Sequence, residues 1–288
     1  MSTLQRVFVA GAGMMGHGIA QVHATAGKNV TLYEPDLARA EAGFARIAGN
    51  LRRAVDKGRL ESDERDAILA LIVPTSDLAT SSDADLVIEA VFEDIDVKHR
   101  LWRDLDRRAP APAIFATNTS SIAIHRLAEA VRRERRRRFI GMHFFSPVPV
   151  MPLVELIRAH ETTDDTVEAV REVAAELGKQ VIVAADRPGF IVNRILMPYL
   201  ADAMRAYEQG VGTAEDIDAG ARVGLNHPMG PLELADFIGL DVCLNVMRVL
   251  EDGLRLEHLH PPRVLQEKVA AGHLGQKTGR GFYTYPRA

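Results

Sequence analysis

The sequence of 288 residues contains one cysteine, Cys243, and one tryptophan. A lone cysteine cannot form a disulfide within the chain and excludes any metal site that needs several thiolates. Long apolar runs are missing too: none approaches the roughly 20 residues of a membrane-spanning helix, and the apolar run near the N-terminus is too short for a signal peptide. We therefore expect a cytoplasmic protein with no membrane segment.

A strong excess of charge is also missing. Lys and Arg number 35 against 39 Asp and Glu, a net charge of -4, which favours neither nucleic acid nor a membrane surface as a partner. The densest charge run, RRERRRR (132–138), leads into an apolar stretch. We interpret it as a solvated loop, because ligands of open α/β sheets bind at the carboxyl ends of the strands, on the opposite edge.

Short apolar runs alternate with helical patterns through the first two thirds of the chain. Expected strands cover residues 6–11, 29–34, 85–91, 113–119, 138–145, 153–157 and 179–186, and the clearest helical patterns between them cover 37–55, 98–107 and 166–177. Because the strands are continuously apolar, they predict a largely parallel sheet with both faces covered. The pattern therefore predicts an α/β domain over residues 1–187.

Beyond Pro188 the pattern changes to helices punctuated by glycine and proline. Helical stretches cover residues 190–208, 214–223 and 232–250, with no comparable series of strands. The Pro188-Gly189 pair ends the preceding strand and redirects the chain. Residues 188–288 are therefore expected to form an all-α C-terminal domain.

A glycine motif follows the first expected strand and opens a helix near Met14. In G-x-G-x-x-G, Gly11 permits the tight turn, Gly13 lets the backbone approach a pyrophosphate, and Gly16 lets helix and strand pack closely. Glu34 ends the second expected strand, where its carboxylate can accept hydrogen bonds from ribose hydroxyls and would repel a 2′-phosphate. The motif predicts NAD rather than NADP; the alternative is a glycine turn beside a surface glutamate.

The stretch GMHFFSPVPVMPLVEL (141–156) contains His143 and Glu155 on either side of three prolines. Histidine suits proton transfer because its ordinary pKa, about 6.5, lies near working pH. A carboxylate on the other ring nitrogen would fix the tautomer and stabilise the imidazolium. Two antiparallel strands could bring this pair together, although these residues alone fit a packed or surface histidine better.

Seven motifs occur in one order along the chain: GAGMMG, VIEAVFEDIDVK, TNTSS, MHFFSPVPVMPLVEL, DRPGFIVNR, HPMGP and KTGRGFY. On these motifs the chain resembles the 3-hydroxyacyl-CoA dehydrogenases, and most closely the short bacterial 3-hydroxybutyryl-CoA dehydrogenases. The resemblance implies a Rossmann-like domain that binds NAD, followed by a helical domain that closes the active site. It further implies an acyl-CoA thioester substrate and a homodimer formed through the helical domain.

The resemblance also implies roles for single residues. His143 would be the general base, oriented by Glu155, while Ser120 and Asn193 would hydrogen-bond the substrate near its reacting oxygen. Asn50 and Lys57 fall where the family contacts CoA. The positions assigned to the cofactor are Gly11, Gly13, Met14, Met15, Gly16, Glu34, Glu93, Lys98, Ser146 and Lys277.

Ser146 departs from the family pattern, because most members have asparagine at this position. A serine is shorter, so its contact with the cofactor could be longer, bridged by water or lost.

Several of these residues have structural alternatives. Ser120 could be the N-cap of a helix that starts near Ile122, and Asn193 could satisfy backbone groups beside Gly189. Lys98 could lie along a helix face with its charged end in water. His227, in NHPMGP, is expected to belong to a structural turn. No cluster of His, Asp and Glu has the spacing of a metal site, so we expect no metal.

The expected function is NAD-dependent interconversion of (S)-3-hydroxyacyl-CoA and 3-oxoacyl-CoA with short acyl chains. One alternative is a dehydrogenase of a free 3-hydroxy acid, against which Lys57 and its long helix argue. Another is a non-catalytic protein that binds the cofactor, against which the intact set of His143, Glu155, Ser120 and Asn193 argues.

Overall fold

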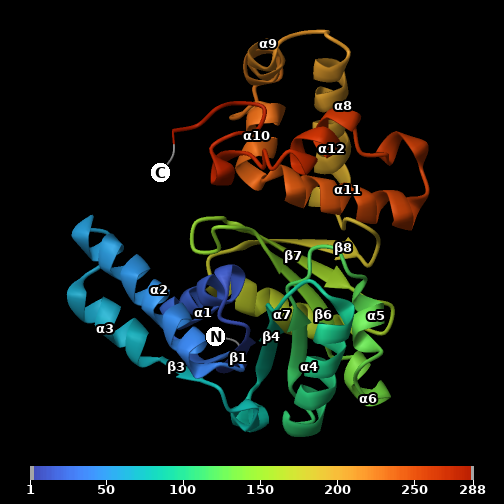
Figure 1. Ribbon diagram of the computed structural model, residues 1–288. Helices are drawn as coiled ribbons and strands as arrows, with labels where there is room; N and C mark the ends of the chain where they lie inside the picture. Colours follow the sequence, from blue (N-terminus) through green and yellow to red (C-terminus); the bar gives the residue numbers. More distant parts are fainter. Residues whose placement is uncertain (1–2, 287–288) are drawn as a thin grey trace. The chain divides into compact units, whose positions relative to one another are not determined.

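The computed structural model describes residues 3–286, so the ends of the two expected domains, residues 1–2 and 287–288, lie outside the described residues. The chain divides into two compact units, Met1–Arg187 and Pro188–Ala288 (Figure 1).

The first unit is built on an eight-stranded sheet with the order β3-β2-β1-β4-β5-β6-β7-β8. Strands β1 to β6 are parallel, β7 is antiparallel to β6, and β8 is parallel to β7. The strand order reverses between β1 and β4, and open α/β sheets bind ligands at the carboxyl ends beside such a point. The strands are β1 (Arg6–Ala10), β2 (Asn29–Tyr33), β3 (Ile72–Thr75), β4 (Leu86–Glu89), β5 (Ile114–Thr117), β6 (Phe139–Phe144), β7 (Leu153–Arg158) and β8 (Gln180–Ala185).

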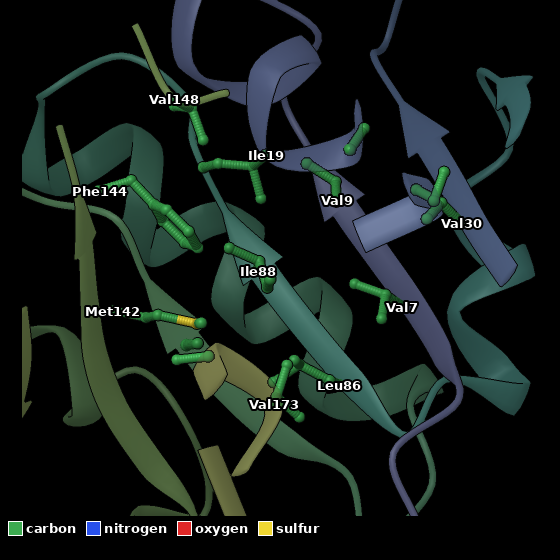
Figure 2. Packing of buried hydrophobic residues seen from close by; sticks show 14 of the residues in the cluster. Val7, Val9, Ile19, Val30, Leu86, Ile88, Met142, Phe144, Val148 and Val173 are labelled. Atoms are coloured by element: carbon green, nitrogen blue, oxygen red, sulfur yellow. The ribbon is translucent and has the colours of Figure 1, made fainter. Parts of the chain in front are cut away.

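Helices cover both faces of this sheet. On one face, apolar side chains of α1, α2 and α7 pack against alternate residues of the strands, and Figure 2 shows Ile19 of α1 near Val9 of β1 and Ile88 of β4. On the other face, Trp102 of α4 stacks on Phe115 of β5, with ring centroids 4.9 Å apart. The helices are α1 (Met14–Thr25), α2 (Leu37–Asp56), α3 (Ser62–Ala70), α4 (Ile95–Arg108), α5 (Ile124–Ala128), α6 (Arg133–Arg136) and α7 (Asp164–Glu176).

The interpretation of RRERRRR as a solvated loop is correct for its five exposed residues and wrong for its centre. The run contains α6, and Arg135 is only 3% exposed. The Arg135 guanidinium donates to the Asp106 carboxylate and to the carbonyl of Ala109, where α4 ends. Arg132 binds the same carboxylate. A buried aspartate and the unpaired carbonyls at a helix end need hydrogen-bond donors. Both groups belong to the end of α4, so the sequence of the arginine run alone does not predict that Arg135 is buried.

Over its described residues, 188–286, the second unit contains five α-helices and a core of buried aliphatic, methionine and cysteine side chains. The single helix expected over residues 232–250 is two helices, because Gly239 has φ 104° and ends α10. The stretch expected over 214–223 starts as α9 and continues as a π-helical turn, Gly220–Gly224. The helices are α8 (Val192–Glu208), α9 (Ala214–Ala219), α10 (Pro231–Ile238), α11 (Leu240–Leu254) and α12 (Arg263–Ala270).

Buried Asp236 fastens the chain end that carries KTGRGFY. Its carboxylate accepts hydrogen bonds from the backbone N–H groups of Phe282 and Tyr283 and from the Tyr285 hydroxyl. Gly281 is required beside it, because a Cβ at this position would lie 1.9 Å from Asp236 Oδ1.

The expected turn at His227 is present: its N–H donates to the carbonyl of Ala221, and its ring hydrogen-bonds the hydroxyl of Tyr199. Residues of both motifs, KTGRGFY and HPMGP, therefore make hydrogen bonds that hold the second unit together.

Candidate active site

Three glycines shape the turn between β1 and α1. Gly11 has φ 106°, and a Cβ there would lie 2.4 Å from the carbonyl oxygen of Ala90. A Cβ on Gly16 would lie 1.7 Å from the Gly11 carbonyl oxygen, so this position accepts only glycine. A Cβ on Gly13 would meet no atom of the described residues within 4 Å, and this residue caps α1 without a side-chain hydrogen bond. The open side of the turn therefore faces the N-terminus of α1, which suits a phosphate.

Glu34 lies directly beside this turn. It follows the last residue of β2, and its Oε2 accepts a hydrogen bond of 2.7 Å from the backbone N–H of Ala12. The carboxylate is thereby fixed at the edge where a ribose bound to the glycine turn would lie. Met14 is 74% exposed at the start of α1. The residues present thus fit an adenine dinucleotide.

His143 and Glu155 form a buried hydrogen-bonded pair. The antiparallel register of β6 and β7 places them directly opposite each other. Nδ1 of His143 lies 2.8 Å from Oε2 of Glu155, and the two residues are 6% and 0% exposed. The Phe145 ring lies 4.6 Å from the imidazole, centroid to centroid. The antiparallel pairing expected from the sequence is therefore present, and it leaves Nε2 as the ring nitrogen directed away from the carboxylate.

Asn118 is a residue near this pair that the sequence reasoning missed. Its side-chain Oδ1 accepts a hydrogen bond of 2.8 Å from the backbone N–H of Phe144, next to His143. The end of β5 is thereby tied to the end of β6. The signal was present in TNTSS, whose asparagine directly follows a buried strand.

Ser120 lies in the loop after β5. Its backbone N–H donates to Oε1 of Glu93 at 3.0 Å. The alternative that Ser120 is a helix N-cap is wrong, because α5 begins at Ile124 and the carboxylate of Asp186 accepts hydrogen bonds from the N–H groups of Ile124 and His125. Asp186 lies 62 residues from Ile124 in the chain, so local sequence gives no sign of it.

The alternative that Lys98 keeps its charged end in water is also wrong. The residue is 1% exposed, and its Nζ lies 2.5 Å from Glu89 and 3.2 Å from Glu93. Burial alone would raise the pKa of Glu93, but the Lys98 ammonium and the hydroxyls of Thr119 and Ser121 lower it below its ordinary value. Glu93 is therefore a carboxylate held in its charged form.

A hollow of about 510 Å³ lies between α1 and α2. Asn50 is part of its lining and is held by hydrogen bonds with Gln21 and Arg53. Lys57 caps the C-terminus of α2, is exposed, and lies outside this lining. The residues that line the hollow include three basic side chains: His17, Arg46 and Arg53.

Three remaining candidates lie elsewhere. Ser146 is exposed, two residues beyond β6. In the second unit, Asn193 lies in the first turn of α8, and Lys277 forms an ion pair of 2.5 Å with Asp241. The contacts expected for Asn193 and Lys277 with substrate or cofactor stay predictions.

Among residues 3–286, no helix is long and apolar enough to cross a membrane. The same described residues contain no group of three or more His, Cys, Asp or Glu side chains that could hold a metal ion.

The fold and the glycine turn define the class of protein: a dinucleotide-binding protein with a Rossmann-like domain. Comparison with known families identifies the chain further. Residues 6–187 match the model of the 3-hydroxyacyl-CoA dehydrogenase NAD-binding domain, and residues 189–285 match that of its C-terminal domain. The chain belongs to the 3-hydroxyacyl-CoA dehydrogenase family.

Individual relatives agree over nearly the full length. The chain is 48% identical over 284 residues to a 3-hydroxybutyryl-CoA dehydrogenase of Bradyrhizobium diazoefficiens, covering 99% of this chain and 96% of the relative. It is also 48% identical to one of Mycobacterium tuberculosis, covering 98% and 99%. The crystal structure of (S)-3-hydroxybutyryl-CoA dehydrogenase PaaH1 from Ralstonia eutropha superposes with a TM-score of 0.96 at 43% identity, covering 99% of this chain and 100% of that one.

These findings confirm the family, the fold class and the cofactor that the sequence predicted. The protein is an NAD-dependent 3-hydroxyacyl-CoA dehydrogenase.

Proposed function

We propose that the enzyme oxidises (S)-3-hydroxybutyryl-CoA to 3-oxobutyryl-CoA and catalyses the reverse reaction, with His143 as general base and acid. The observation that carries this proposal is the buried His143–Glu155 pair at the carboxyl end of β6. The relatives named above are 3-hydroxybutyryl-CoA dehydrogenases, which supports the choice of a short acyl chain.

Oxidation of a secondary alcohol separates a proton from oxygen and a hydride from carbon. His143 accepts the hydroxyl proton at Nε2, while Nδ1–H donates to Glu155. The Glu155 carboxylate stabilises the imidazolium, and the buried setting strengthens this attraction. NAD, when bound, supplies the acceptor for the hydride that leaves C3 of the substrate. In the reverse direction, His143 returns the proton to oxygen.

Ser120 and Asn193 are proposed to hydrogen-bond the reacting oxygen. Both are neutral donors, so they can hold a hydroxyl or a ketone oxygen without competing for its proton. The attachment of the Ser120 backbone to Glu93 supports this role, because it fixes the loop that presents the hydroxyl.

The cofactor is proposed to bind along the carboxyl ends of β1, β2 and β4. The glycine turn with Met14 and Met15 would receive the phosphates, and Glu34 the adenosine ribose. Glu93 in the loop after β4, Lys98 in the first turn of α4, Ser146 after β6 and Lys277 of the second unit complete the proposed set.

The hollow beside α2 is proposed to receive phosphate groups of CoA. Arg46 and Arg53 add two permanent positive charges beside Asn50, and Lys57 lies one helical turn beyond Arg53. A free 3-hydroxy acid lacks the phosphate groups of CoA that would extend to this hollow, which disfavours the alternative substrate.

A homodimer in the cytoplasm is proposed as the working form. Large apolar side chains are exposed on the second unit, among them Ile195 at 67%, Phe237 at 53% and Val242 at 43%. Surfaces of this kind commonly mark protein interfaces.

The test is a series of 3-oxoacyl-CoA substrates of increasing chain length, each with NADH and NADPH, together with 3-hydroxybutyrate and its CoA thioester in the oxidation direction. We expect the highest kcat/KM for 3-oxobutyryl-CoA with NADH and no useful rate with free 3-hydroxybutyrate. Equal rates with the thioester and the free acid would overturn the proposed substrate.

A further inference from the structure

Glu89, the last residue of β4, has a buried carboxylate that takes no part in the proposed proton and hydride transfer. It is 0% exposed in a strand whose other residues are all apolar. Its Oε1 accepts hydrogen bonds from the backbone N–H of Val91 at 2.9 Å and from Lys98 Nζ at 2.5 Å. Its Oε2 accepts one of 2.7 Å from the hydroxyl of Thr117. The charge is thus fully satisfied, which is the condition for keeping it inside a protein.

Lys98 connects Glu89 to a second carboxylate, that of Glu93. Its ammonium lies between the two carboxylates, 2.5 Å from Glu89 and 3.2 Å from Glu93. Oε1 of Glu93 then accepts four hydrogen bonds from three consecutive residues of the following loop. The donors are the Thr119 hydroxyl, the N–H groups of Ser120 and Ser121, and the Ser121 hydroxyl. The loop is therefore organised around one oxygen atom, whose position depends on Lys98.

The network lies on the same face of the sheet as the proposed catalytic pair. Glu89 is directly opposite Thr117, and Thr117 is opposite Gly141. Side chains alternate along a strand, so His143, two residues after Gly141, points to the same face. The network therefore lies across β5 from His143, on the same face of the sheet.

Burying the Glu89 carboxylate with the Lys98 ammonium costs more desolvation free energy than an apolar pair of the same volume, and replacing such an ion pair by apolar residues is often neutral or stabilising. Stability alone is therefore a poor reason for Glu89 and Lys98 at these positions. Fixing the direction of Glu93 is a better one, because charge-assisted hydrogen bonds set geometry within narrow limits.

We propose that Glu89 is a positioning residue of the dehydrogenase, which acts through Lys98 and Glu93 to fix the loop 119–121 and with it the Ser120 hydroxyl. The inference rests on the proposed role of Ser120 in holding the substrate oxygen. It also gives Lys98 the role of an internal support of Glu93.

The test uses Glu89→Gln, Lys98→Met and the double variant, with two measurements on each. Amide hydrogen exchange at Ser120 and Ser121 reports on the loop without any substrate, and we expect it to accelerate at least about tenfold in both single variants. Steady-state oxidation of 3-hydroxybutyryl-CoA should show kcat lowered by about tenfold, because the Ser120 hydroxyl is misplaced. In the double variant the loss should match that of a single variant, because both residues act through one path.

Lys28→Met is the matched control. Lys28 is equally buried, and its Nζ lies 2.5 Å from Glu176 on α7, away from the loop. This variant should lower the melting temperature and leave both kcat and the exchange at Ser120 and Ser121 at wild-type values. If Glu89→Gln does not fold, Thr117→Val and Thr117→Ser replace it: only the valine, which removes the hydroxyl that donates to Glu89, should speed the exchange.

Unchanged exchange at Ser120 and Ser121 in the folded variants would overturn the inference. So would losses of kcat that multiply in the double variant, because the two residues would then act independently. Absence of turnover in the wild-type enzyme would refute the proposed substrate, but the exchange measurement would still decide whether Glu89 fixes the loop.

Discussion

Replacing Glu155 by glutamine removes one negative charge at nearly constant side-chain size. Glu155 is fully buried, and its Oε2 lies 2.8 Å from His143 Nδ1. Once His143 holds the substrate proton, opposite charges about 4 Å apart attract by roughly 4 kcal/mol at an effective dielectric constant near 20. Loss of this attraction in the transition state lowers kcat by about 10³-fold. The glutamine amide also no longer fixes the imidazole tautomer.

The assay is steady-state oxidation of (S)-3-hydroxybutyryl-CoA at saturating NAD, with the melting temperature as a check on folding. Glu176→Gln is a suitable control, because it neutralises another paired carboxylate of the first unit, the partner of Lys28. We expect Glu155→Gln to lower kcat with little change in KM, and the control to retain wild-type turnover. A folded Glu155→Gln enzyme with kcat within about threefold of wild type would refute the reasoning.

Three further predictions concern residues outside this pair. Burial lowers the pKa of His23 from 6.5 to about 4. Between these pH values the unfolded chain binds a proton that the native protein does not. The free energy of unfolding should therefore fall by roughly 3 kcal/mol as the pH drops through this range. Urea unfolding across the range should show the loss, and His23→Asn should flatten it. Gly16→Ala should abolish NADH binding in a fluorescence titration, because its Cβ would meet the Gly11 carbonyl, whereas Gly220→Ala, in open space, should not. Ser146→Asn should tighten NADH binding in the same titration, and an unchanged affinity would mean that residue 146 makes no contact.

Much of the fold is readable from the sequence because its strong signals are local. The apolar runs predicted seven of the eight strands. The missed strand, β3, is a four-residue edge strand with Pro74 inside it, and neither its length nor its composition stands out. The helix expected over 232–250 failed for a similar reason: the apolar period continues through Gly239, and only its positive φ divides α10 from α11.

The site could be predicted where one strand pair defines it. The three prolines after β6 and the carboxylate in the next apolar run were enough to suggest the His143–Glu155 pairing. Contacts made across the fold could not be foreseen. Asp186 caps α5 from 62 residues away in the chain. Lys98 is buried because its ammonium pairs with the carboxylate of Glu89 at the end of β4. Such partners depend on the packing of the whole sheet, which residue patterns along the chain do not report.

The central claim is that His143 carries the proton in an NAD-dependent oxidation of a short 3-hydroxyacyl-CoA. The most direct measurement is NADH formation from (S)-3-hydroxybutyryl-CoA by the wild-type enzyme and by His143→Ala, side by side. We predict turnover by the wild-type enzyme and a loss of at least ~10²-fold in kcat in the folded variant. Near-normal turnover by His143→Ala, or no turnover by the wild-type enzyme, would contradict the claim.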